Sequence, residues 1–159
     1  MKITILCVGK IKEKYFSDAI AEYSKRLSRY CRLEIIEVPD EKTPDRASQT
    51  EMDLIKAKEA ERLLKYVKED AFKIVLAIQG RKMSSEKFSA CIEQLGVRGV
   101  SHIIFFIGGS LGLDDRIIRM ADLSLSFSDM TFPHQLMRVI LLEQIYRGYR
   151  ISFGEPYHK

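Results

Sequence analysis

The chain has 159 residues, 46% of them hydrophobic, and its 26 basic and 22 acidic side chains give a net charge of +4. This length fits a single domain over residues 1–159, which can bury about 70% of its unfolded surface without a disulfide or a metal. No apolar run approaches the roughly 20 residues of a membrane-spanning helix. Cys7, Cys31 and Cys91 lie too far apart for a metal motif, and their odd number favours a reducing, cytoplasmic setting.

Strand and helix patterns alternate from one end of the chain to the other. Short β-branched and aromatic runs predict five strands, at 2–8, 33–38, 72–78, 102–107 and 123–127. Apolar residues at helical spacing predict helices at 13–30, 48–68, 84–95 and 134–149, with a short one opened by Asp114 or Asp115. This alternation is typical of an α/β fold with a five-stranded, mostly parallel sheet and helices on both faces.

Local signals mark several element boundaries. Ser48 and Glu51 have the spacing of a capping box, Ser84 or Ser85 can cap the next helix, and Gly96 can end it. Ligands of parallel sheets bind beyond the carboxyl ends of the strands. The candidate ligand loops are therefore 79–83, 108–113 and 128–133.

The first candidate is the glycine-rich turn IGGSLG at 107–112. Glycines let a backbone approach a ligand closely and direct amide groups toward it. The turn lacks the GxGxxG spacing of dinucleotide enzymes, and no acidic residue ends the following strand. From these residues alone it is either a ligand loop or simply a tight strand-to-helix turn.

The second candidate is the segment 127–150, in which a polar loop, SDMTFP, precedes a helix that is apolar on almost every face. A helix of this kind is buried all round, either inside the domain or against a second copy in a twofold dimer. Four polar residues interrupt it. The two alternatives for these residues are that they form ion pairs or that they bind anions. The residues are Arg138, Glu143, Gln144 and Arg147.

Basic side chains gather at two places in the sequence. One cluster is Lys25, Arg26, Arg29 and Arg32, and the other lies in the last 27 residues, with Arg138, Arg147, Arg150 and Lys159. Such clusters permit a nucleic-acid partner without requiring one, because most are solvated helix faces. The histidines give no metal spacing, and structural or capping roles suit His102 and His134, while a frayed terminus suits His158.

The combination of IGGSLG, the downstream LSFSDMTFPHQLMRVILLEQIYR and a terminal Tyr-His-Lys resembles the SPOUT class of RNA methyltransferases. Within that class it resembles the small bacterial enzymes that methylate N3 of a pseudouridine in 23S ribosomal RNA. The likeness extends over the whole chain and implies a C-terminal trefoil knot, S-adenosylmethionine as cofactor and a homodimer with a shared site. The cofactor loops it implies are Leu76, Gly108, Phe127, Ser128, Asp129, Met130, Thr131 and Phe132.

The resemblance also gives roles to the tail. His158 becomes the expected base for the N3 proton, because an imidazole can accept a proton near neutral pH, and Tyr157 would stack on or bond to the base. Phosphates of an assembled ribosome would be held by Arg138, Arg147, Arg150 and Lys159, and less directly by Arg29 or Arg32. A SPOUT enzyme with another RNA target and a non-catalytic RNA-binding module remain alternatives.

Overall fold

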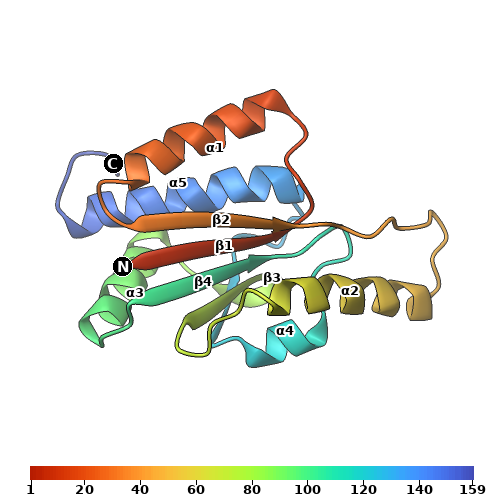
Figure 1. Cartoon of the computed structure of the whole chain (residues 1–159). Coiled ribbons are helices and arrows are strands. Elements are labelled where there is room, and N and C mark those ends of the chain that lie inside the picture. Colours follow the sequence, from red (N-terminus) through yellow and green to blue (C-terminus); the bar gives the residue numbers. More distant parts are fainter.

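The computed structural model describes every residue from 1 to 159, with five strands and five helices in alternation (Figure 1). The strands are β1 Lys2–Val8, β2 Arg32–Val38, β3 Phe72–Lys82, β4 His102–Ile107 and β5 Leu123–Ser126. The helices are α1 Lys14–Leu27, α2 Gln49–Leu64, α3 Ser85–Val97, α4 Asp115–Met120 and α5 His134–Ser152.

The strands form one sheet in the order β2-β1-β4-β3-β5. Every neighbouring pair is parallel, so the predicted sheet is confirmed and is parallel throughout. The carboxyl ends of β4, β3 and β5 therefore meet side by side at one edge. β4 and β5 are each followed by a loop that the sheet rule selected, whereas most of the predicted loop 79–83 belongs to β3 itself, which continues to Lys82.

Two apolar layers cover the two faces of the sheet. Alternate side chains of β1 enter different layers, because successive residues of a strand point to opposite faces: Ile3 and Ile5 lie in one, Leu6 and Val8 in the other. The first layer packs on α1, α3 and α5, and the second on α2 and α4. Figure 1 shows α1 and α5 above the sheet and α2 and α4 below it, which confirms helices on both faces.

Side-chain caps fix where three helices begin. The Ser48 hydroxyl accepts from the Glu51 amide at 3.2 Å, and the Glu51 carboxylate accepts from the Ser48 amide at 2.7 Å, which confirms the capping box. Ser84 caps α3, and Asp114 caps α4. Gly96 does not end α3, because the helix runs on to Val97. Gly99, at φ +86°, takes the left-handed conformation instead.

Strand β3 is longer than its sequence pattern indicated. The prediction ended at residue 78, whereas the strand continues to Lys82 after an irregularity in its pairing with β5 between Leu76 and Arg81. At Gly80 the two strands cross so closely that a Cβ would lie 2.7 Å from the Leu125 carbonyl carbon. Glycine is needed here to let one backbone pass the other, rather than to close a loop.

The cysteines are free thiols, and burial raises the pKa of Cys7 to about 12 and of Cys31 to about 11. A thiol with a raised pKa is rarely ionised, so neither of these two is poised as a nucleophile. None of the helices combines the length and apolar content that crossing a membrane requires. No three His, Cys, Asp or Glu side chains gather in a way that could hold a metal ion.

Candidate active site

The turn after β4 is shaped by glycines that no other residue could replace without strain. A Cβ on Gly108 would lie 2.6 Å from the Gly112 carbonyl carbon, because the turn doubles back on itself. Gly112 has φ +83°, and its amide donates to the Gly109 carbonyl at 3.1 Å. The turn thus presents bare backbone at the carboxyl edge of the sheet, as a ligand loop does.

The loop after β5 leaves backbone groups available. The Ser128 hydroxyl accepts from the Met130 amide at 3.0 Å, and Lys82 pairs with the Asp129 carboxylate at 2.5 Å. The amides of Asp129, Thr131 and Phe132 make no hydrogen bond within the chain. The side chain of Met130 is 73% exposed. The loop therefore has a fixed shape, but three of its backbone amides have no acceptor and the Met130 side chain is exposed.

The residues that could contact a nucleoside cofactor are apolar side chains and bare backbone. Leu76, within β3, and Phe127, directly after β5, are half-buried apolar side chains that pack on the core. Together with the bare turn at Gly108 they offer flat apolar contact next to free amide donors, which is what an adenine ring and its edge nitrogens need. Of the residues that the sequence assigned to the cofactor, the structure shows Leu76 and Phe127 packed on the same core layer, and their part in cofactor binding stays a prediction.

A buried carboxylate beside the turn was missed by the sequence analysis. Glu59 of α2 is only 4% exposed, accepts from the Glu41 amide at 3.3 Å and packs against Gly109. Burial, with Asp40 nearby, raises its pKa. A signal did exist, because Glu59 lies four residues from both Ile55 and Leu63, on the buried stripe of α2.

The C-terminal tail folds back onto α5. The Tyr157 ring lies edge-on to Tyr146 at 4.9 Å between centroids and under the Arg147 guanidinium at 4.7 Å. Its hydroxyl donates to the Glu143 carboxylate at 3.1 Å. Burial and this carboxylate raise the pKa of Tyr157, so its hydroxyl is neutral and serves as a donor. The tail is therefore ordered, and a frayed end is excluded.

His158 is held from both sides. Arg147 lies 3.2 Å from its Nδ1, and the Glu86 carboxylate lies 2.8 Å from its Nε2. A guanidinium can only donate, so Nδ1 accepts and Nε2 carries the hydrogen given to Glu86. Hydrogen bonds from its own backbone amide and from Ser84, and then this contact with His158, lower the pKa of Glu86 to about 2. The two contacts thus fix the orientation of the ring.

Arg138 is the predicted phosphate ligand that the structure contradicts. Its side chain is 1% exposed, and its guanidinium donates to Glu37 at 2.5 Å and to the carbonyls of Val8 and Gly9 at 3.1 and 2.6 Å. A buried arginine with these partners has no face to offer to RNA. The ion-pair interpretation of Arg138 is the correct one.

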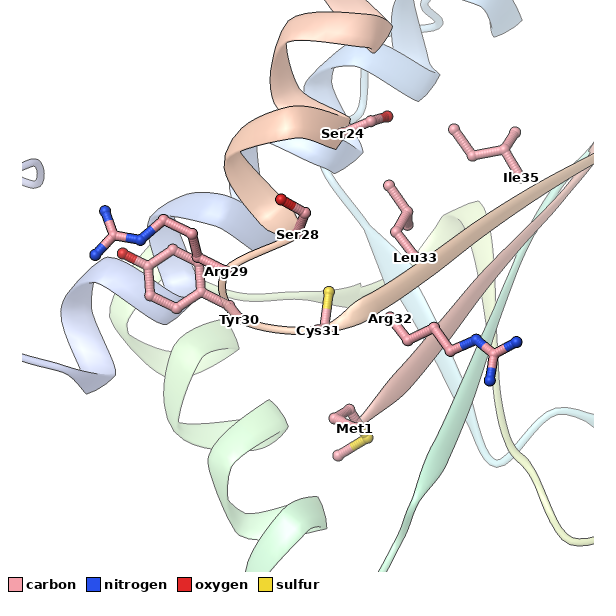
Figure 2. A pocket seen from close by; sticks show the side chains of 9 residues that line it. All are labelled: Met1, Ser24, Ser28, Arg29, Tyr30, Cys31, Arg32, Leu33 and Ile35. Carbon is pink, nitrogen blue, oxygen red and sulfur yellow. The ribbon is translucent and has the colours of Figure 1, made fainter.

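The other predicted arginines lie in two settings. Arg147 pairs with Glu143 at 2.6 Å within α5. Arg150 pairs with Glu155 at 2.5 Å, which links α5 to the C-terminal tail. Arg29 and Arg32 line a broad groove of about 880 Å³ where β1 and β2 begin (Figure 2). This groove lies where the strands begin, at the opposite edge of the sheet from the 108–113 and 127–132 loops of the same chain.

A comparison with protein families now identifies the class. The family model described as a predicted SPOUT methyltransferase matches residues 1–158. The chain therefore belongs to the SPOUT methyltransferases. The C-terminal trefoil knot that the resemblance implied follows from membership of this class.

Curated relatives narrow the class further. The chain is 64% identical over 159 residues to a protein of Bifidobacterium adolescentis, and 60% identical to one of Clostridium kluyveri. Each match covers all of both chains, and both relatives are named ribosomal RNA large subunit methyltransferase H. The sequence most resembles this kind of SPOUT enzyme.

Solved structures share the fold at low sequence identity. A probable methylase family protein of Haemophilus influenzae has a TM-score of 0.57 at 11% identity, over 99% of this chain and 70% of that one. A putative methyltransferase of Legionella pneumophila, solved with bound SAM, has a TM-score of 0.50 at 13% identity, over 94% of this chain and 66% of that one. At these identities the likeness shows the fold alone.

Proposed function

We propose that the chain transfers a methyl group from S-adenosylmethionine to N3 of a pseudouridine in 23S ribosomal RNA, on an assembled ribosome in the cytoplasm. The observation that carries the proposal is full-length identity of 58–64% to relatives named for methylation of large-subunit ribosomal RNA. The loops at the carboxyl edge of the sheet, which can bind the cofactor, and the ordered Tyr157–Lys159 tail, which can act on the substrate base, support the proposal.

The cofactor would be held by the turn at Gly108, by the loop 127–132 and by Leu76 of β3. Gly108 and its turn let the backbone approach the nucleoside, and the free amides of the 127–132 loop can bond to the edge of its base. Leu76, Phe127 and Phe132 can sandwich the ring. When bound, the cofactor supplies a methyl carbon that is already electrophilic because it is attached to a positively charged sulfur. The chain then has to orient the nucleophile and remove its proton.

The tail is proposed to act on the substrate base. His158 would accept the N3 proton, which requires its Nδ1 to leave Arg147, and Glu86 would steady the ring through Nε2. Tyr157 can stack on an extruded base or bond to it through its hydroxyl. Phosphates would be held by Lys159, and by Arg147 and Arg150 in competition with their carboxylate partners.

A homodimer with a shared site is part of the proposal. Along α5, residues 134–151 are all buried or half-buried, and the sheet, α1 and α3 account for much of this. Four half-buried apolar residues of α5 belong to neither core layer, and three of them, Leu136, Val139 and Ile140, lie together in its first half, away from Ile151. We propose that this strip packs against its copy in the partner, so that the tail of one subunit faces the cofactor of the other.

Methyl transfer to ribosomes tests the function. Purified protein is incubated with labelled S-adenosylmethionine and with whole ribosomes, isolated large subunits or naked 23S RNA from cells that lack the modification. We expect saturable label in the RNA, strongest with whole ribosomes. Saturable cofactor binding without label in any RNA would reject this function, and absence of both would favour a non-catalytic binding module.

A further inference from the structure

The loop between β1 and α1 is charged, exposed and close to the cofactor loops. Residues 10–15 have the sequence Lys-Ile-Lys-Glu-Lys-Tyr, and all of them except Ile11 are exposed. The side chain of Tyr15 is 65% exposed. Lys14 is paired with Asp18 at 2.6 Å, whereas Lys10 and Lys12 have no carboxylate within ion-pair distance. Two cations and an aromatic ring are thus left free on one short stretch.

The backbone of this loop is fastened to the start of α5. The Lys12 amide donates to the Gln135 side chain at 3.0 Å, and Gln135 stands only three residues after the cofactor loop 127–132. The Ile11 amide donates to Glu37 at 3.0 Å, and the buried Arg138 joins Glu37 to the Gly9 carbonyl. Figure 1 shows this loop rising at the same end of the molecule as the start of α5.

An ordered loop of this kind is well suited to bind a polyanion. The lysine ammonium groups attract phosphates, and the loop carries one opposing carboxylate, Glu13, beside three lysines. Because the backbone is already fixed, binding orders little more than the lysine side chains. Tyr15, with Phe16 at 4.6 Å between centroids, offers a face for a base or a ribose.

We propose that residues 10–15 form a second contact surface for the ribosomal RNA, with Lys10 and Lys12 on backbone phosphates and Tyr15 against a nucleotide next to the target. This inference rests on the proposed function, since it takes the RNA as substrate. It adds a substrate surface at the carboxyl edge of the sheet, apart from the tail and from the arginines at the opposite edge. This contact would position the target nucleotide next to the neighbouring cofactor loops.

The test compares two doubly substituted full-length proteins. Lys10→Ala/Lys12→Ala removes the free cations without touching the backbone hydrogen bonds of the loop. The matched control, Lys65→Ala/Lys68→Ala, removes two exposed lysines between α2 and β3, where Lys68 lies near His102 at the start of β4. For each protein we measure ribosome binding without cofactor across a salt series, then KM and kcat for ribosomes, and affinity for S-adenosylmethionine.

For Lys10→Ala/Lys12→Ala we expect ribosome affinity to fall and KM to rise about tenfold relative to the control. The plot of log affinity against log salt should be shallower by about 1.4 to 1.8, because each lost phosphate contact changes it by about 0.7 to 0.9. Cofactor affinity should stay within twofold. Tyr15→Ala should weaken ribosome binding with little change in the salt slope. Lys12→Arg keeps the positive charge and should bind ribosomes as the unsubstituted protein does.

If Lys10→Ala/Lys12→Ala has the same ribosome affinity and salt slope as the control, residues 10–15 do not contact the RNA and the proposal is wrong. Failure of the unsubstituted protein to methylate any RNA would instead count against the proposed function. Binding measured without cofactor keeps the two results apart.

Discussion

At the scale of single residues, the most consequential side chain is Arg138, because it joins α5 to the ends of β1 and β2. Its pairing with Glu37 spans 101 positions of the chain. No local pattern indicates which of several arginines in a helix will be buried against a carboxylate that far away in the chain. The sequence could state only the alternatives, ion pair or anion binder, and packing decided between them.

We expect Arg138→Ala to destabilise the fold by about 1–3 kcal/mol, since it leaves the buried Val8 and Gly9 carbonyls without a donor, while the partly exposed Glu37 carboxylate can turn to water. Urea denaturation measures the free energy of unfolding. The exposed Arg32→Ala is the control and should change it by less than about 0.5 kcal/mol. Equal effects of the two substitutions would contradict the buried-pair interpretation.

His134 makes stability depend on pH. Burial, with Arg138 nearby, lowers the pKa of His134 from its ordinary value of 6.5. Between the lowered pKa and 6.5 the unfolded chain binds more protons than the folded one, so the free energy of unfolding falls as the pH drops through this window. Burial lowers the pKa of His102 in the same direction.

The checking measurement is urea denaturation at pH 7.5, 6.0 and 5.0, on the unsubstituted protein and on His134→Asn. We expect the variant to lose less stability on acidification, because one of the two histidines with a lowered pKa is gone. Parallel pH profiles for the two proteins would show that His134 does not contribute.

At the scale of elements, periodicity predicted every strand and helix but not all of their ends. Caps with side-chain partners, such as Ser48 with Glu51, were readable because both partners lie within one turn. The extension of β3 past Gly80 depends on how closely β5 approaches it in space, which a local pattern cannot contain. The candidate ligand loops were predicted from the sheet rule, and the individual cofactor residues only from the family resemblance. The position of the tail on α5 depends on the packing of Tyr157 on Tyr146, which no local pattern contains.

The tail gives a prediction at this scale. His158→Ala should lower the rate of methyl transfer at least tenfold while cofactor affinity stays within a few-fold, in keeping with the size of general-base effects. His102→Gln, a change at a histidine in the sheet, is the control and should leave the rate unchanged. Full turnover by His158→Ala would remove this histidine as the base.

At the scale of the whole molecule, the chain alone leaves an apolar strip on α5 without a place in its core. We expect the unsubstituted protein to sediment as a dimer at micromolar concentration and Ile140→Asp to sediment as a monomer, because a carboxylate would be buried in the interface. Leu54→Asp changes an apolar residue of α2 that is 57% exposed and should not affect the mass. A monomeric unsubstituted protein would contradict the shared site.

The most direct measurement of the central claim is to locate the added methyl group. Ribosomes lacking the modification are treated with the protein and S-adenosylmethionine, and the 23S RNA is analysed by reverse transcription and by mass spectrometry of its fragments. A methyl group on N3 blocks base pairing, so we predict one new stop, at a single pseudouridine, in a fragment heavier by one methyl group. A methyl group on a ribose, on another base, or absent from the RNA would contradict the proposal.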